Sequence, residues 1–111
     1  MQRFAVLGCV VTLLGAAGLL AAHHSAALAA THTVTIDGVT FVPATLVVKA
    51  GETVVWVNKD PFPHTVASQT GGFASPAIEP GQSWSYTPTK PGVFPYLCTL
   101  HPTMHAMLTV E

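Results

Sequence analysis

Hydrophobic and polar residues alternate in short runs along most of the chain, a pattern typical of half-buried β-strands. The clearest run, residues 83–87, places Trp84 and Tyr86 on one face and small hydroxyl side chains on the other. Gly and Pro separate the runs, and no segment after residue 31 has the 3.6-residue period of an amphipathic helix. The runs that we expect to be strands are 33–36, 45–48, 53–57, 83–87, 93–98 and 106–110.

Seven or so short strands with regular turn signals predict an all-β domain, a sandwich or a barrel, rather than βαβ units. Residues 69–76 have the loosest pattern and should form the longest loop. In the run 93–98, alternation puts Phe94, Tyr96 and Cys98 on the same side. The two aromatic side chains should therefore belong to a core that continues up to the cysteine sulfur.

The first residues have the features of a cleavable signal peptide. Arg3 gives a positive start, an apolar run extends from residue 4 to about 22, and Ala27-Leu-Ala29 has the small-x-small pattern of a cleavage site. The run is almost long enough for a membrane helix, but its Gly/Ala content and the polar residues 23–25 favour export. We expect a signal peptide at 1–29, cleaved after Ala29 or Ala30, and one domain at 30–111 without stable membrane insertion.

The expected domain carries few charges. Three lysines stand against five acidic residues, so the net charge is about −2 with histidine neutral; these residues are Lys49, Lys59, Lys90, Asp37, Glu52, Asp60, Glu79 and Glu111. The absence of a basic patch argues against nucleic acid as a partner. Partner recognition should depend more on apolar contact than on electrostatic steering.

The expected domain holds a single cysteine, which cannot form an internal disulfide. It belongs to a closely spaced motif, Cys98-x-x-His101-x-x-Met104. Pro102 cannot continue a strand ladder, so His101 and Met104 should lie on a tight loop between two strands. Each residue alone has a structural explanation, as a buried thiol, a turn residue or core filler. Together their spacing favours metal binding.

A fourth candidate ligand is His64, in a turn that Pro61 and Pro63 restrict. Two imidazoles, one thiolate and a weak axial thioether are the ligand set of a blue-copper electron-transfer centre. Met107 is the rival axial ligand, although the last strand should have begun by then. Zinc is the alternative metal, but zinc sites rarely use methionine.

These motifs resemble those of the cupredoxins, and within them of the amicyanins, with plastocyanins and pseudoazurins as broader relatives. The resemblance covers essentially the whole expected domain. It includes residues 51–58, the Pro63-His64 turn, Pro91-Gly92, Tyr96-x-Cys98-Thr99 and the short ligand loop. It implies a cupredoxin-like Greek-key β-sandwich of about seven to eight strands.

The resemblance also implies a role for each matching position. One copper ion, cycling between Cu(I) and Cu(II), would be bound by His64, Cys98, His101 and Met104. The edge of His101 would be the electron exit, within an apolar patch; the expected patch residues are Phe62, Pro63, Leu100 and Pro102. Thr65 stands where relatives have Asn, and its hydroxyl should bond towards Thr99. His105 should be a surface residue.

The resulting hypothesis is a soluble, monomeric carrier, exported to the periplasm, that shuttles single electrons and is not an enzyme. Its implied partners are transient redox proteins, with a dehydrogenase donor and a cytochrome acceptor as candidates. The alternative is a copper storage or delivery protein, but such proteins favour exposed, exchangeable Met and His ligands. A copper enzyme would need a second, open site with more histidines.

Cleavage after Ala29 would make Ala30 the new amino terminus, with His32 as its third residue. The free amine and His32 together could then chelate a second Cu(II) ion.

Overall fold

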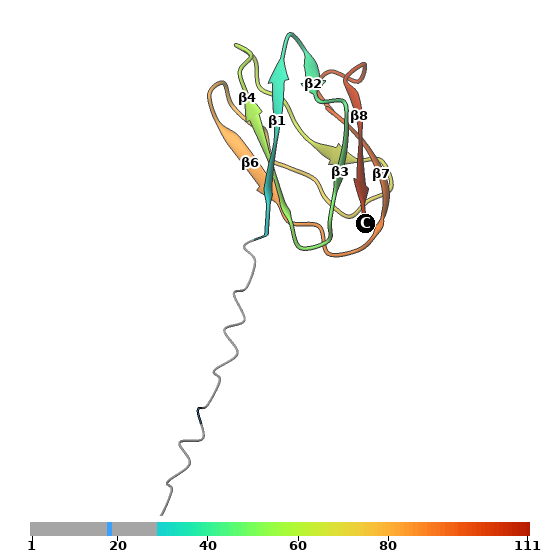
Figure 1. The fold of residues 1–111 in the computed structure, drawn as a ribbon. Coiled ribbons are helices and arrows are strands. Elements are labelled where there is room, and N and C mark those ends of the chain that lie inside the picture. Colours follow the sequence, from blue (N-terminus) through green and yellow to red (C-terminus); the bar gives the residue numbers. More distant parts are fainter. Residues whose placement is uncertain (1–17, 19–28) are drawn as a thin grey trace, which may run out of the picture.

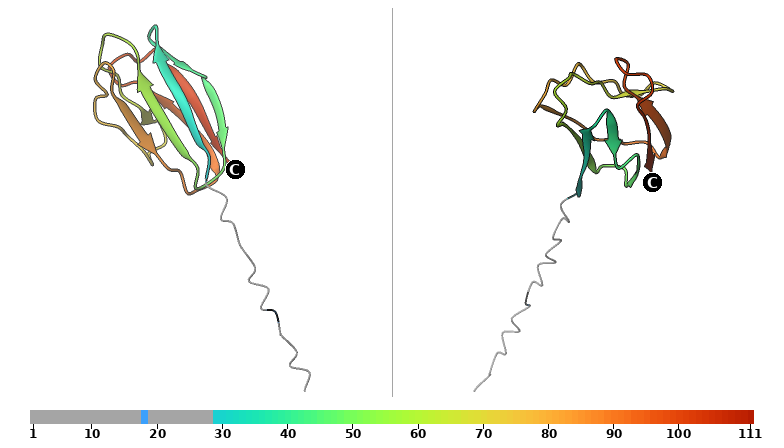
Figure 2. Two further views of the ribbon diagram at one scale, coloured as in Figure 1. Left: turned by 60° about the vertical axis from the view of Figure 1, so that its left-hand side comes forward. Right: turned by 90° about the horizontal axis from the view of Figure 1, so that it is seen from above.

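The computed structural model describes residue 18 and residues 29–111. The expected signal segment 1–29 therefore lies almost entirely outside the described residues, and its boundary stays a prediction. The described residues form two four-stranded sheets that pack face to face and contain no helix (Figures 1 and 2). In this part of the chain, then, no helix is long and apolar enough to cross a membrane.

The first sheet has the order β2-β1-β4-β6, and its strands are β1 (Thr31–Asp37), β2 (Thr40–Val42), β4 (Thr53–Asn58) and β6 (Ser83–Tyr86). The second has the order β3-β8-β7-β5, and its strands are β3 (Thr45–Val48), β8 (His105–Val110), β7 (Gly92–Leu97) and β5 (Ala67–Ser68). Two pairs, β1–β4 and β3–β8, are parallel. The predicted all-β sandwich is confirmed; the alternation pattern did not predict the short strands β2 and β5.

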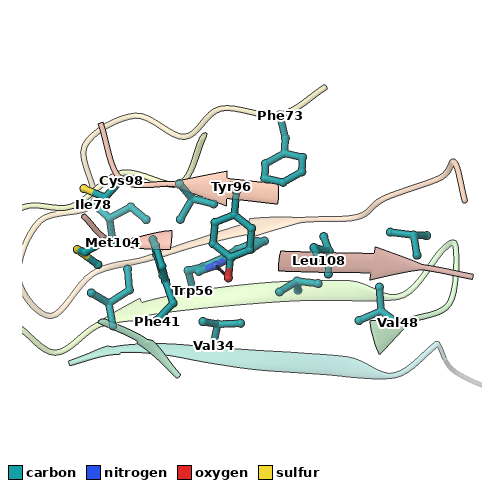
Figure 3. Packing of buried hydrophobic residues seen from close by; sticks show 14 residues of the cluster. Val34, Phe41, Val48, Trp56, Phe73, Ile78, Tyr96, Cys98, Met104 and Leu108 are labelled. Atoms are coloured by element: carbon teal, nitrogen blue, oxygen red, sulfur yellow. Dashed lines mark hydrogen bonds between the residues drawn. The ribbon is translucent and has the colours of Figure 1, made fainter. Parts of the chain in front are cut away.

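Alternation along the strands sends every second side chain into the space between the sheets. In β4 these residues are Val54, Trp56 and Asn58, all fully buried. Trp56 lies at the centre of the core, where its indole N–H donates to the Tyr96 hydroxyl over 3.2 Å (Figure 3). Burial raises the pKa of Tyr96 to about 12, although the bond from Trp56 acts in the opposite direction.

Tyr96 and Cys98 are both buried on the same side of the β7 segment, as alternation predicts, and Phe94 is partly buried against the same core. Residues 69–82, between β5 and β6, form the longest connection in the described chain and contain the loop expected at 69–76. Phe73 anchors this connection, because its buried ring lies 4.8 Å from the Tyr86 ring. The loop thus closes one side of the sandwich, while most of its polar residues stay exposed.

Candidate metal centre

Two connections between strands bring the sequence-predicted ligands to one end of the core. His64 lies between β4 and β5, and its backbone exchanges two hydrogen bonds with Ile78, of 3.1 and 2.7 Å. Cys98, His101 and Met104 lie between β7 and β8. Figure 3 shows Cys98 and Met104 together at the same end of the hydrophobic core.

Three side chains converge on one point. Cys98 Sγ lies 3.7 Å from His64 Nδ1 and 3.9 Å from His101 Nδ1, and the three donor atoms all lie within 4.8 Å of one another. His64 and Cys98 are fully buried and His101 is partly buried. One soft sulfur donor and two imidazoles facing it form a set that suits copper. No other group of this kind was found within the described residues.

The ligand loop is closed by its own backbone. Cys98 N–H donates to the Met104 carbonyl over 3.2 Å, and Met104 N–H donates to the His101 carbonyl over 2.9 Å. The Met104 side chain is 2 % exposed, and its sulfur points in the same direction as that of Cys98 (Figure 3). Met107, the rival, is 40 % exposed and lies within β8 opposite Pro95. The structure therefore favours Met104 as the fourth ligand.

Thr65 ties the two loops together, as the sequence predicts. Its hydroxyl oxygen accepts the Thr99 N–H over 2.8 Å and lies 2.8 Å from the Thr99 hydroxyl. Its backbone N–H donates to Cys98 Sγ over 3.3 Å. A donor aimed at the sulfur stabilises negative charge there, and the loop-to-loop bonds hold Cys98 and His64 at a constant separation.

Sequence reasoning missed Asp60, which lies beside His64. One carboxylate oxygen, Oδ2, is 2.8 Å from His64 Nε2, and the two backbone N–H groups of Gly38 and Val39 donate to the carboxylate over 2.7 and 2.9 Å. Burial of Asp60 by itself raises the pKa of its carboxyl, but these hydrogen bonds and His64 outweigh it, so the pKa lies below its usual value. The available signal was a carboxylate four residues before a candidate ligand in a restricted turn.

The partly buried His101 is bordered by exposed apolar residues. Phe62 is 51 % exposed with its ring 6.4 Å from that of His101, and Leu100 is 52 % exposed. Pro63 and Pro102 are also exposed. The four residues expected to surround the electron exit are therefore all at the surface, and we call them the apolar rim.

The remaining histidines lie outside this cluster. His105 is exposed, as expected, and its Nδ1 lies 3.5 Å from the Gln69 amide nitrogen. His32 lies in β1 with its Nε2 3.3 Å from a carboxylate oxygen of Glu52. The chelation of Cu(II) by His32 and a new amino terminus depends on the cleavage site and stays a prediction.

Comparisons with known proteins agree with this geometry. A family model described as "Cupredoxin-like domain" matches residues 10–110. Amicyanin of Paracoccus denitrificans is 31 % identical over 98 % of this chain and 95 % of its own length. The solved structure of a mutant amicyanin in its Cu(I) form matches with a TM-score of 0.68 and 31 % identity, over 73 % of this chain and 82 % of that one.

A copper-containing nitrite reductase from Thermus scotoductus also matches, with a TM-score of 0.69 and 31 % identity over 73 % of this chain. The match covers only 22 % of that enzyme, so the two share a domain and not a whole architecture. The family match, the amicyanin relative and the two-sheet fold lead to one conclusion: the chain belongs to the cupredoxin-like family.

Proposed function

We propose that this protein is a one-electron carrier that holds a single copper ion between His64, Cys98, His101 and Met104. The observation that supports it most directly is the buried Cys98 sulfur, with the Nδ1 atoms of both histidines within 3.9 Å. A buried cysteine packed against the core needs no such convergence for stability. The amicyanin of Paracoccus denitrificans, which matches along 98 % of this chain, supplies the family context.

Copper, when bound, supplies the one-electron redox couple, and the protein supplies a constant geometry. The Thr65–Thr99 bonds and the backbone bonds from Cys98 to Met104 and from Met104 to His101 restrain the donor atoms before any metal binds. Ligands that are already in position move little when the oxidation state changes. A small rearrangement lowers the barrier to electron transfer.

The electron would enter and leave over the edge of His101. Of the two histidines, only His101 is partly exposed, and the apolar rim surrounds it. Exposed apolar residues around a redox centre suit a small, short-lived interface with other redox proteins. A dehydrogenase donor and a cytochrome acceptor are the candidate partners, and the carrier itself would act as a monomer.

Export to the periplasm completes the proposal. The features of residues 1–29 support it. A copper storage or delivery role is less well supported, because His64, Cys98 and Met104 are buried, whereas exchangeable ions need accessible ligands. An enzymatic role has no second ligand cluster in the described chain to support it.

The colour of the copper-loaded protein tests this function. We expect intense visible absorption from thiolate-to-Cu(II) charge transfer, bleached reversibly by ascorbate, with one copper per chain. Cys98→Ser should abolish the absorption, because it removes the thiolate. His105→Ala is the control and should leave the spectrum unchanged, since His105 lies outside the cluster. A colourless copper-loaded wild-type protein would exclude the carrier.

A further inference from the structure

The hydrogen bonds of Asp60 distinguish His64 from His101. Asp60 is only 6 % exposed, and its Oδ2 lies 2.8 Å from His64 Nε2, on the ring edge opposite Nδ1. Among the described residues, no carboxylate lies within ion-pair distance of His101. Asp60 thus anchors His64 inside the protein, whereas His101 has no such carboxylate partner among the described residues.

The carboxylate of Asp60 is itself held by a distant part of the chain. Gly38 and Val39, in the turn between β1 and β2, donate their backbone N–H groups to Oδ1 and Oδ2 respectively. Both residues have positive φ, 60° and 58°, which points their N–H groups the same way. The backbone N–H of Asp60 donates in turn to Asn58 Oδ1 over 2.9 Å. The carboxylate is therefore positioned independently of His64.

This arrangement determines the tautomer of His64. An ionised carboxylate has no proton to donate, so a hydrogen bond between Asp60 Oδ2 and His64 Nε2 requires the proton to be on Nε2. A neutral imidazole has one N–H, which leaves a lone pair on Nδ1. Nδ1 is the atom that faces Cys98 Sγ at 3.7 Å.

A carboxylate on the far nitrogen also makes an imidazole a stronger donor. The added negative charge stabilises the more positive Cu(II) state more than Cu(I). We infer that Asp60 is a positioning residue that aims His64 Nδ1 at the copper and lowers the reduction potential of the site. The inference rests on the proposed function and deepens it, because the β1–β2 turn becomes part of what sets the potential.

Asp60→Asn tests the inference, with Thr40→Val as the matched control. Asn keeps the size of the side chain but removes the negative charge and one acceptor oxygen. Thr40→Val removes the bond from the Thr40 hydroxyl to the Asp37 carbonyl, 2.6 Å long, in the same turn. It weakens the turn without touching the carboxylate. The measurements are the visible spectrum, the Cu(II) and Cu(I) affinities and the midpoint potential.

We expect Asp60→Asn to stay blue, with a Cu(II) affinity about 10–100-fold lower and a smaller loss for Cu(I). Each tenfold difference between the two losses raises the potential by about 59 mV. Thr40→Val should keep the wild-type potential. Equal potentials in Asp60→Asn and wild type would overturn this inference but leave the proposed carrier function intact. A copper-loaded wild-type protein without blue colour would instead rule out the carrier function.

A measurement on the wild-type protein covers the case in which Asp60→Asn does not fold. In the Cu(I) form, the ring N–H proton of His64 should be visible by NMR and protected from exchange with water, because it is buried and bonded to Asp60. The ring N–H of His101, partly exposed, provides the internal comparison and should exchange fast. Equally fast exchange at His64 would contradict the inference.

Discussion

At the level of single residues, the burial of a methionine side chain determines whether its sulfur can bind the metal. Met104 and Met107, three residues apart, differ in this respect. Met104 ends the ligand loop and is buried, whereas Met107 lies in β8 and is 40 % exposed. Because strand residues alternate between faces, a side chain that follows the loop by three positions turns outward here. Of the two methionines, only Met104 can therefore contribute a thioether sulfur at the buried end of the core.

Met104→Ala should keep the blue colour and raise the midpoint potential. Loss of a weak axial donor leaves the copper–thiolate bond intact but removes electron density that favours Cu(II). Spectra and redox titration of the copper-loaded variant measure both effects. Met107→Ala is the matched control; if it produced the shift and Met104→Ala did not, the axial assignment would be wrong.

Tyr96 combines a buried hydroxyl with a structural hydrogen bond. Tyr96→Phe leaves the buried Trp56 N–H without its acceptor, so we expect a loss of about 1–3 kcal/mol in the free energy of unfolding. Tyr86→Phe, which breaks no hydrogen bond within the described residues, should cost much less. Urea unfolding of the metal-free proteins measures both.

Because of Tyr96, we expect the folded protein to lose stability at alkaline pH. Its pKa is about 12 when folded and about 10 when unfolded, so the folded state holds the phenol proton more tightly. The contribution to stability is complete below about pH 10 and is lost as the pH rises towards 12. The free energy of unfolding should fall less steeply with pH in Tyr96→Phe than in wild type across that window. Identical slopes of this free energy against pH would contradict the prediction.

At the level of elements, the site depends on two connections that different strands hold in place. The β4–β5 connection carries His64 and the β7–β8 loop carries the other proposed ligands, and Thr65 joins them through Thr99. These segments are more than thirty residues apart in the chain. Their separation is therefore set by the packing of the sheets and by a few bonds across the gap.

Thr65→Val should lower the stability of the metal-free protein by about 1–2 kcal/mol, because the Thr99 N–H loses its acceptor. The shape of the side chain is preserved, so the copper-loaded variant should still be blue. Thr53→Val is the control: it breaks an exposed hydroxyl pair with Thr87 and should change stability by less than about 0.5 kcal/mol. Equal losses in the two variants would show that Thr65 does not join the loops.

At the level of the whole molecule, the apolar rim and the low charge should govern encounters with other proteins. Leu100 lies next to His101 and is half exposed, whereas Val93 lies in β7 and is 57 % exposed. A lysine at either position changes the net charge equally. Only the first would place a charge at the proposed contact.

Leu100→Lys should slow electron self-exchange between Cu(I) and Cu(II) copies by about tenfold at low salt, which corresponds to about 1.4 kcal/mol of repulsion and lost contact. Added salt should recover part of the rate, because it screens the new charges. The visible spectrum should not change. NMR line broadening measures the exchange, and a similar slowing in Val93→Lys would place the contact elsewhere.

Local patterns carried much of the prediction. Alternation found the six longer strands, and Pro102 indicated the tight turn of the ligand loop. The Thr65–Thr99 contact followed from family resemblance and is confirmed. The strands β2 and β5 were not predicted, because two or three residues are too few to show an alternation of hydrophobic and polar positions.

The sequence by itself determined the kinds of donor atoms, their spacing in the ligand loop and the strand pattern, since these follow from residue identity and local periodicity. Only the tertiary structure decided which side chains meet. Asp60 reaches His64 in a position that the turn at Gly38 and Val39 holds, and no local pattern connects residues twenty positions apart. The parallel pairing of β1 with β4 makes that connection, because it places the end of β1 beside the end of β4.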